Sequence, residues 1–257
     1  MKIPYKRQVI ITMLLIMSGG VASALFNEEK EEEFQLVEST DSLPSVSLLS
    51  INEVDSIGAD PNERYLHLTE NDFQIVAEEL DVEIAAIKAV VEIEAGKAMK
   101  GFWAPGIPVI NFDRSMYVKY RNKAASTSGA EGETVPEGLT GYAKKEWTEL
   151  INARKTNAQG ANLGTFWGMF QIGGFNYKLC GCSSVDEFVK RMAYSELEQL
   201  QLFAVFITNT GMVESLRKKN WSAFARKYNG PSYAKRGYHT KMANAYARYS
   251  KQNQQKS

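Results

Sequence analysis

The sequence predicts a mostly α-helical protein with one small β element. Apolar residues recur at helical spacing over most of residues 66–250, whereas short runs that favour strands are sparse. Of the 257 residues, 44% are hydrophobic, 11% aromatic and 23% charged, as in a globular protein. This length suits one globular domain of ordinary size with additional segments.

The N-terminus predicts export. A basic start precedes an apolar run over residues 9–17 and small residues at 22–24, which matches a secretory signal peptide of residues 1–24. The run is short for a membrane-spanning helix, and an uncleaved anchor is the alternative. Residues 25–62 are acidic and serine-rich without a sustained helical period, so we expect a flexible linker there. The mature protein is therefore expected in the periplasm or outside the cell.

The folded domain is expected over residues 63–250. Its first helix follows Thr69, which forms a capping-box pattern with Asp72 ahead of apolar residues at helical spacing. A second helix is expected to start near residue 82 and to end at Gly96, because glycine is a natural helix stop.

Past the second helix, a Gly- and Pro-rich stretch at residues 101–108 leads into a short extended segment at residues 109–113. Residues 114–121 follow this segment, and a loop is expected over residues 123–140. Helical patterning then returns five times before a polar tail: residues 142–153, 185–192, 195–208, 221–228 and 241–249, with the tail at 251–257.

The formal net charge is zero, with 30 Lys and Arg against 30 Asp and Glu. This balance argues against a nucleic-acid binder that relies on overall basicity. Residues 27–63 are acidic and residues 217–251 are basic. A basic segment favours an anionic polymer such as bacterial cell wall, although a solvated charged surface explains it equally well.

Cysteine and histidine are too few and too scattered for a metal site. Cys180 and Cys182 flank Gly181, and a disulfide between them would close a small strained ring, so free thiols are expected. His67 and His239 lie far from each other and from the cysteines. We therefore expect no metal and no cofactor.

Glu94, at the end of the second helix, is the strongest candidate for a catalytic group. It continues a face made by Ile87 and Val91, whereas Glu92 points about 200° away. A carboxyl group at the inner end of an apolar face is partly desolvated, which raises its pKa and keeps it protonated for general-acid cleavage of a glycosidic bond. The alternative is a helix-terminal Glu satisfied by nearby backbone donors.

Glycosidases usually need a second carboxylate. Asp113 is the best candidate, since it follows an apolar segment that could line a cleft, and a local ion pair with Arg114 is its alternative role. Acidic residues of the long loop are weaker candidates: Glu131, Glu133 and Glu137.

Two segments rich in glycine and aromatic residues are candidates for binding sugar. Gly168 lets a backbone approach a ligand closely, and Gln171 offers a donor and acceptors for acetamido or hydroxyl groups. Asn229 begins an Asn-Gly-Pro turn. Four aromatic side chains offer flat faces to sugar rings, although each alone is more often a core residue: Trp167, Phe170, Tyr228 and Tyr233.

Together these segments resemble the lysozyme-like N-acetylmuramidase domain of many phage endolysins and related bacterial wall hydrolases. The similar segments, in order, are Glu92-Ile93-Glu94-Ala95-Gly96, Gly101-Phe102, Phe112-Asp113-Arg114, Phe166-Trp167-Gly168-Met169-Phe170-Gln171-Ile172, Trp221 to Tyr233 and Ala243 to Tyr249. The resemblance covers about residues 66–250.

This resemblance implies a lysozyme-like α+β fold with a small β element beside a substrate cleft. It also implies cleavage of the β-1,4 bond between N-acetylmuramic acid and N-acetylglucosamine, with Glu94 as the catalytic acid. The chain departs from the family pattern where Ala95 replaces the usual Ser and where Asp113 replaces the usual Glu. The second departure puts the geometry of a second carboxylate in doubt.

The expected partner is the glycan strand of peptidoglycan, bound by a monomer that needs no nucleic acid and no membrane beyond the export signal. Three alternatives stay open. The same Glu94 could serve a lytic transglycosylase that forms 1,6-anhydro products. The domain could bind peptidoglycan without cleaving it, or the enzyme could act as a toxin against other bacteria.

Overall fold

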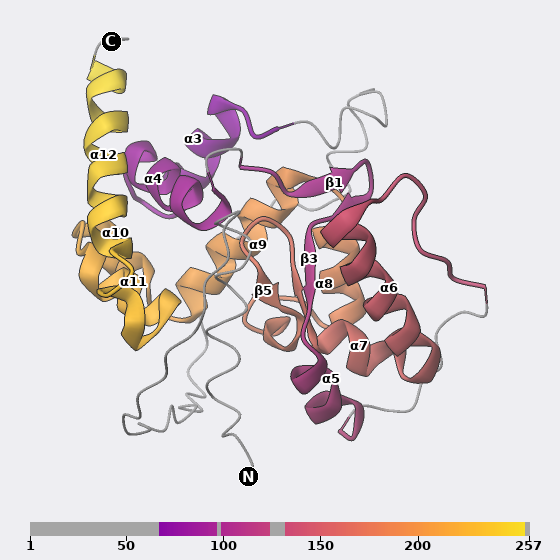
Figure 1. Cartoon of the computed structure of the whole chain (residues 1–257). Helices are drawn as coiled ribbons and strands as arrows, with labels where there is room; N and C mark the ends of the chain where they lie inside the picture. Colours follow the sequence, from indigo (N-terminus) through magenta and orange to yellow (C-terminus); the bar gives the residue numbers. More distant parts are fainter. Residues whose placement is uncertain (1–66, 97–98, 124–131, 255–257) are drawn as a thin grey trace.

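The computed structural model of the chain describes residues 67–96, 99–123 and 132–254 (Figure 1). The predicted signal peptide and linker, residues 1–24 and 25–62, lie outside the described residues. Within that part, helices predominate and the strands are short, which confirms the mostly helical α+β class. None of the helices described there is long and apolar enough to cross a membrane.

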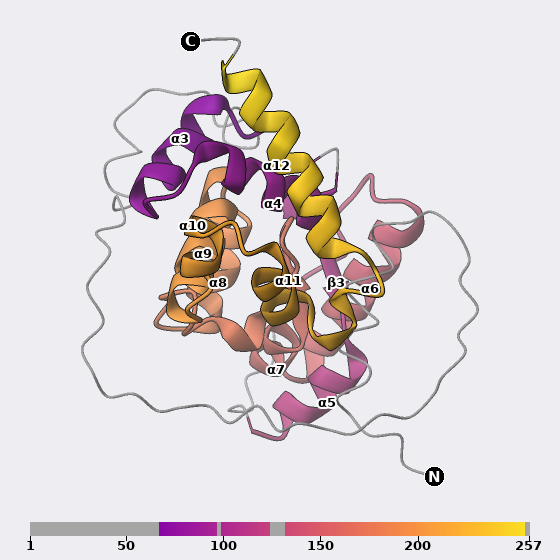
Figure 2. The same cartoon turned by 90° about the vertical axis from the view of Figure 1, so that its left-hand side faces the viewer.

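The first two helices form as the local pattern predicts. Helix α3 spans Glu70–Glu79, and Thr69 and Asp72 make both hydrogen bonds of the expected capping box. Helix α4 spans Ile84–Ala95 and ends at Gly96, whose φ of 77° is left-handed and suits glycine. The last helix, α12 (Tyr238–Gln254), lies along α4 (Figures 1 and 2).

Two small sheets follow α4. Strands β1 (Phe102–Ala104) and β2 (Ile107–Pro108) form an antiparallel pair. A second sheet has the order β3-β4-β5 and is antiparallel throughout. Its strands are β3 (Ile110–Phe112), β4 (Thr165–Trp167) and β5 (Ile172–Gly173). The extended segment predicted at residues 109–113 is confirmed as β3, whereas the other four strands were not predicted.

The remaining helices agree with the predicted ones except for three short additions. The predicted helices appear as α6 (Gly141–Thr156), α8 (Val185–Met192), α9 (Glu196–Asn209) and α11 (Trp221–Asn229). The additions are α5 (Arg114–Arg121), α7 (Ala158–Leu163) and α10 (Val213–Arg217), and 3-10 turns lie at Gly174–Asn176 and Pro231–Tyr233. Helix α12 continues to Gln254, so residues 251–254 of the predicted polar tail are helical.

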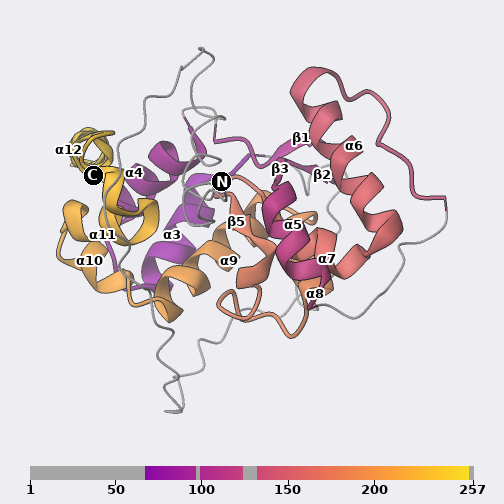
Figure 3. The same cartoon turned by 60° about the horizontal axis from the view of Figure 1, so that its bottom comes forward.

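Helix α9 lies in the middle of the molecule. In Figures 1 and 3 the helices α3, α4, α10, α11 and α12 lie on one side of it, and α5 to α8 with the strands lie on the other. Residues 198–204 of α9 are buried without interruption, so every side of this stretch packs against protein. Polar side chains on this stretch must therefore find partners inside the protein.

Candidate active site

Glu94 lies in the last turn of α4. Ile87 and Val91, which precede it on the same face, are fully buried, and Glu94 itself is half-buried. The helix therefore carries an apolar face from the core to a carboxyl group at its end, as the spacing predicts.

Asn229, the last residue of α11, binds this carboxyl group. Its Nδ2 donates to Glu94 Oε1 at 3.0 Å, a contact between residues 135 positions apart in the chain. Burial raises the pKa of Glu94 to about 7, and the hydrogen bond from Asn229 opposes part of that rise. A large share of Glu94 is thus protonated near neutral pH, which is the state of a general acid.

Two tyrosines lie near enough to Glu94 for its charge to affect them. Burial raises the pKa of Tyr228 well above its usual value, and the charge of Glu94 adds to the rise. Burial and the Glu94 charge likewise raise the pKa of Tyr238, the first residue of α12. Both phenols therefore stay neutral where Glu94 titrates. Tyr238 was missed by the sequence analysis, because a tyrosine in a polar C-terminal segment carries no local signal of a distant carboxyl group.

Glu92 points away from this site. Its Oε2 accepts hydrogen bonds from Arg248 and from the Tyr249 hydroxyl, both on α12. The two carboxylates of one helix thus serve different neighbours, as their angular separation predicts. Glu92 ties α4 to α12, and Glu94 faces α11 and the start of α12.

The aromatic residues of the segment at 167–171 lie in the core. Trp167 is 0% exposed and donates from Nε1 to the Asn162 carbonyl at 3.0 Å. Phe170 is 1% exposed and stacks on Phe203 of α9, with the ring centroids 4.2 Å apart. Neither ring has a face open to a sugar in this structure, so the alternative role of core residue describes them better. They hold the β4–β5 turn against α9.

Gly168 is approached closely by protein side chains, where the sequence analysis expected a ligand. Its φ is 70°, and a Cβ atom there would lie 2.8 Å from Gln199 Cδ and 2.9 Å from Met192 Sδ. Gln171 also has a left-handed φ of 50°, and its Nε2 donates to the Gly168 carbonyl at 2.8 Å. The glycine and the glutamine thus build the turn itself, and contact between Gln171 and substrate stays a prediction.

Tyr228 and Tyr233 differ in their surroundings. The Tyr228 hydroxyl donates to the Phe170 carbonyl at 2.9 Å, and its ring stacks on Phe224. Tyr233 is half-buried in the 3-10 turn after α11. Its ring and that of His239 form an edge-to-face pair with the ring centroids 5.4 Å apart. Tyr228 therefore links the 168–171 turn to α11, directly before Asn229. Contact between Tyr233 and sugar stays a prediction.

Asp113 lies at the N-terminus of α5 and caps that helix. Its Oδ1 accepts hydrogen bonds from the Ser115 amide at 2.8 Å, the Ser115 hydroxyl at 2.6 Å and the Met116 amide at 3.0 Å. The residue is buried, with 8% exposed. This placement accounts for the carboxylate by a structural role, and its role as a second catalytic carboxylate stays a prediction.

The cysteines and histidines form no cluster around Glu94. Cys180 and Cys182 are buried free thiols, and burial raises the pKa of Cys182 to about 11. Among the residues that the structure describes, no three His, Cys, Asp or Glu side chains are grouped so that they could hold a metal ion.

Comparison with known proteins identifies a family and similar solved structures. The N-acetylmuramidase family model matches residues 83–250. The crystal structure of the Burkholderia AP3 phage endolysin is similar with a TM-score of 0.60 and 35% sequence identity, over 75% of this chain and 74% of that chain. No curated protein matches the chain.

Proposed function

The chain belongs to the N-acetylmuramidase family of peptidoglycan-cleaving glycoside hydrolases, and we propose that it cleaves the β-1,4 bond between N-acetylmuramic acid and N-acetylglucosamine with Glu94 as general acid. The observation that carries this proposal is the environment of Glu94. Burial at the end of α4 raises its pKa to about 7, so the group can give a proton near neutral pH.

In the proposed reaction the Glu94 carboxyl group donates its proton to the glycosidic oxygen as the bond from that oxygen to the anomeric carbon breaks. Positive charge then develops on the sugar ring as an oxocarbenium-like transition state. The Asn229 amide, 3.0 Å from Glu94 Oε1, stabilises the carboxylate that remains. Attack by water at the anomeric carbon completes hydrolysis and returns a proton to Glu94.

A second carboxylate is the usual group that activates this water. Asp113 is the carboxylate predicted for it, yet its Oδ1 already serves three donors of α5. This observation favours a second candidate, a lytic transglycosylase, because that reaction uses the 6-hydroxyl of the sugar as nucleophile and needs no second carboxylate. The predicted substrate contacts of Gln171, Asn229 and Tyr233 belong to either reaction.

The test is mass spectrometry of muropeptides released from purified peptidoglycan by the wild type and by Glu94→Gln. We expect reducing-end N-acetylmuramic acid products, reduced about 100-fold or more in the variant. Glu92→Gln is the matched control, since Glu92 lies on the same helix and faces α12. Anhydro products would move the assignment to a transglycosylase. Wall binding without products from the wild type would leave a binding module.

Export of the protein, its action outside the cytoplasm and its monomeric state also stay proposals. Expression of the full chain in a bacterium, followed by intact mass measurement of the exported form, tests the first two. We expect a chain that begins at Leu25, after loss of residues 1–24. A full-length, membrane-bound product would instead support the uncleaved anchor. Light scattering of the purified form tests the monomeric state.

A further inference from the structure

Gln199 of α9 joins three segments of the chain through one buried side chain. The residue is 0% exposed. Its Oε1 accepts from the Met169 amide at 2.8 Å, and its Nε2 donates to the carbonyls of Gly101 at 3.1 Å and Met192 at 2.8 Å. A buried amide with both ends hydrogen-bonded has one preferred orientation, so the segments it binds are held at fixed positions.

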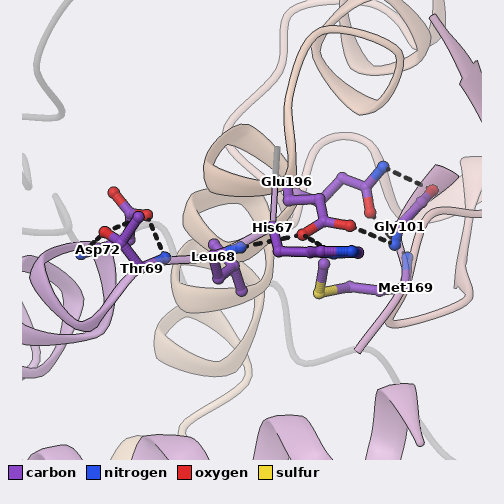
Figure 4. Close-up of polar contacts among 8 residues, drawn as sticks. His67, Leu68, Thr69, Asp72, Gly101, Met169 and Glu196 are labelled. Atoms are coloured by element: carbon purple, nitrogen blue, oxygen red, sulfur yellow. Dashed lines mark hydrogen bonds and ion pairs between the residues drawn. The ribbon is translucent and has the colours of Figure 1, made fainter. Parts of the chain in front are cut away.

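Glu196, one helical turn before Gln199, binds the same glycine from the other side. Its Oε1 accepts from the Gly101 amide at 2.8 Å, so α9 holds both the N–H and the C=O of Gly101 (Figure 4). Its Oε2 accepts from the Leu68 amide at 3.0 Å and lies 3.5 Å from His67 Nδ1. The carboxylate is 2% exposed and is thus satisfied inside the protein.

Two glycines of the sequence motifs fit against the Gln199 amide. A Cβ atom at Gly101 would lie 2.4 Å from Gln199 Oε1, and one at Gly168 would lie 2.8 Å from the same oxygen. Each distance is well inside van der Waals contact. The side chain could yield only by giving up its hydrogen bonds, so glycine is required at Gly101 by Gln199 itself.

The segments that Gln199 holds lead to Glu94 by two routes. Gly101 lies on the segment that follows α4, seven residues after Glu94. Met169 precedes Phe170, whose ring stacks on Phe203 one turn after Gln199. The Phe170 carbonyl accepts from Tyr228, which precedes the Asn229 that binds Glu94.

We propose that Gln199, supported by Glu196, is a positioning residue of the muramidase site. It holds the Gly101 segment and the 168–171 turn, and through Phe170 and Tyr228 it keeps Asn229 and a dry environment around Glu94. The inference rests on the proposed function, because it takes Glu94 as the acid.

The test measures the titration midpoint of the Glu94 carboxyl group directly. Carboxyl ¹³C NMR of glutamate-labelled protein, with the Glu94 signal assigned by its loss in Glu94→Gln, gives the titration midpoint in each variant. Among the described residues, Asn229 of α11 binds Glu94, and the charge of Glu94 acts on Tyr228 of α11 and Tyr238 of α12, whose phenols stay neutral through this range. The same variants are assayed for kcat and KM on soluble peptidoglycan fragments.

Gln199→Met keeps the length of the side chain and removes its three hydrogen bonds. We expect the Glu94 midpoint to fall from about 7 toward its ordinary value, because burial contributes more to the pKa than the Asn229 hydrogen bond does. We expect kcat to fall about tenfold or more, with a smaller change in KM. Gly101→Ala places a methyl group against the Gln199 amide and displaces it, although residue 199 itself is not substituted. It should shift the midpoint in the same direction.

Glu198→Gln is the matched control, since Glu198 neighbours Gln199 on α9 and the substitution weakens its buried ion pair with Arg191 of α8. It should lower Tm and leave the Glu94 midpoint unchanged. If Gln199→Met and Gly101→Ala lower Tm but leave the Glu94 midpoint unchanged, the inference is overturned while the proposed function stands. If Gln199→Met does not fold, Gly101→Ala decides by the same readout. Full activity of Glu94→Gln would overturn the proposed function itself.

Discussion

Glu94 and Asp113 are carboxylates at opposite ends of helices, and the two ends give them different chemistry. Glu94 lies at the C-terminal end of α4, where Asn229 donates to it. Asp113 lies at the N-terminal end of α5, where two amides and one hydroxyl donate to a single oxygen. Both residues are removed from bulk water to a large degree, so burial alone does not separate them.

The two ends of a helix differ in the hydrogen-bond donors that they offer to a carboxylate. The N-terminus of a helix offers unpaired N–H groups that favour a negative charge, whereas the C-terminus offers carbonyl oxygens that oppose one. At Glu94 burial outweighs the one amide of Asn229, and the pKa rises to about 7. At Asp113 the donors make the carboxylate a cap. The following predictions test this contrast.

The largest expected effect is on catalysis. Glu94→Gln should lower the hydrolytic rate about 100-fold or more, because the proton donor is lost. Asp113→Asn should change the rate of the folded enzyme far less and should lower the free energy of unfolding by about 1 kcal/mol through the weakened cap. Rates measured with thermal unfolding curves of both variants check this. An inactive Asp113→Asn with an unchanged Tm would instead support Asp113 as the second carboxylate.

The next effect is a pH-dependent gain in stability on replacing Glu94. Below pH 4.5 the group is protonated in both the folded and the unfolded state. As the pH rises from there to about 7, the unfolded state loses its proton first, so stability falls by an amount that is constant above pH 7. Glu94→Gln removes this penalty. Its free energy of unfolding should exceed that of the wild type by at most about 3 kcal/mol at pH 8 and differ little at pH 4.

Urea unfolding at pH 4, 6 and 8 measures that difference. The control is Glu92→Gln, which loses the ion pair with Arg248 and should be less stable than the wild type at pH 8. A gain for Glu94→Gln that does not vary with pH would contradict the raised pKa.

The smallest effect concerns the donor to Glu94. Asn229→Leu removes the hydrogen bond that stabilises the carboxylate, so the pKa of Glu94 should rise further. Activity falls as the pH rises through that pKa, because the acid must be protonated. We therefore expect the alkaline limb of the pH–kcat profile to move up by about one unit or less. Asn220→Ala weakens α11 at its other end and should leave the limb in place. A downward shift in Asn229→Leu would show that Asn229 mainly excludes water.

The parts predicted correctly are those with a local signal. The Thr69 capping box and helix α8 at residues 185–192 appeared as expected, because spacing and caps act within a few residues. Helices α7 and α10 were missed because six and five residues are too few for a period to show. Strand β4 was missed because it pairs with β3, more than fifty residues away in the chain.

The same limit applies to the site. Trp167 and Phe170 are predicted as sugar-stacking rings but lie in the core, because the sequence does not distinguish an aromatic residue of a cleft from one of a core. One feature of the sequence bears on Gln199. Four of the first six residues of α9 are polar, and a helix buried on every side forces such polar groups to bind protein.

The sequence alone predicts a mostly helical domain that resembles the N-acetylmuramidase family and carries Glu94 in the last turn of its second helix, on the face of Ile87 and Val91. These features follow from spacing within one helix and from motifs in order along the chain. The tertiary structure adds that Asn229 binds Glu94 and that Tyr238 lies near its charge. It also shows that Asp113 caps α5 and that Gln199 binds Gly101 and Met169. A contact such as that between Asn229 and Glu94, 135 positions apart, depends on how the helices pack, and no local period encodes it.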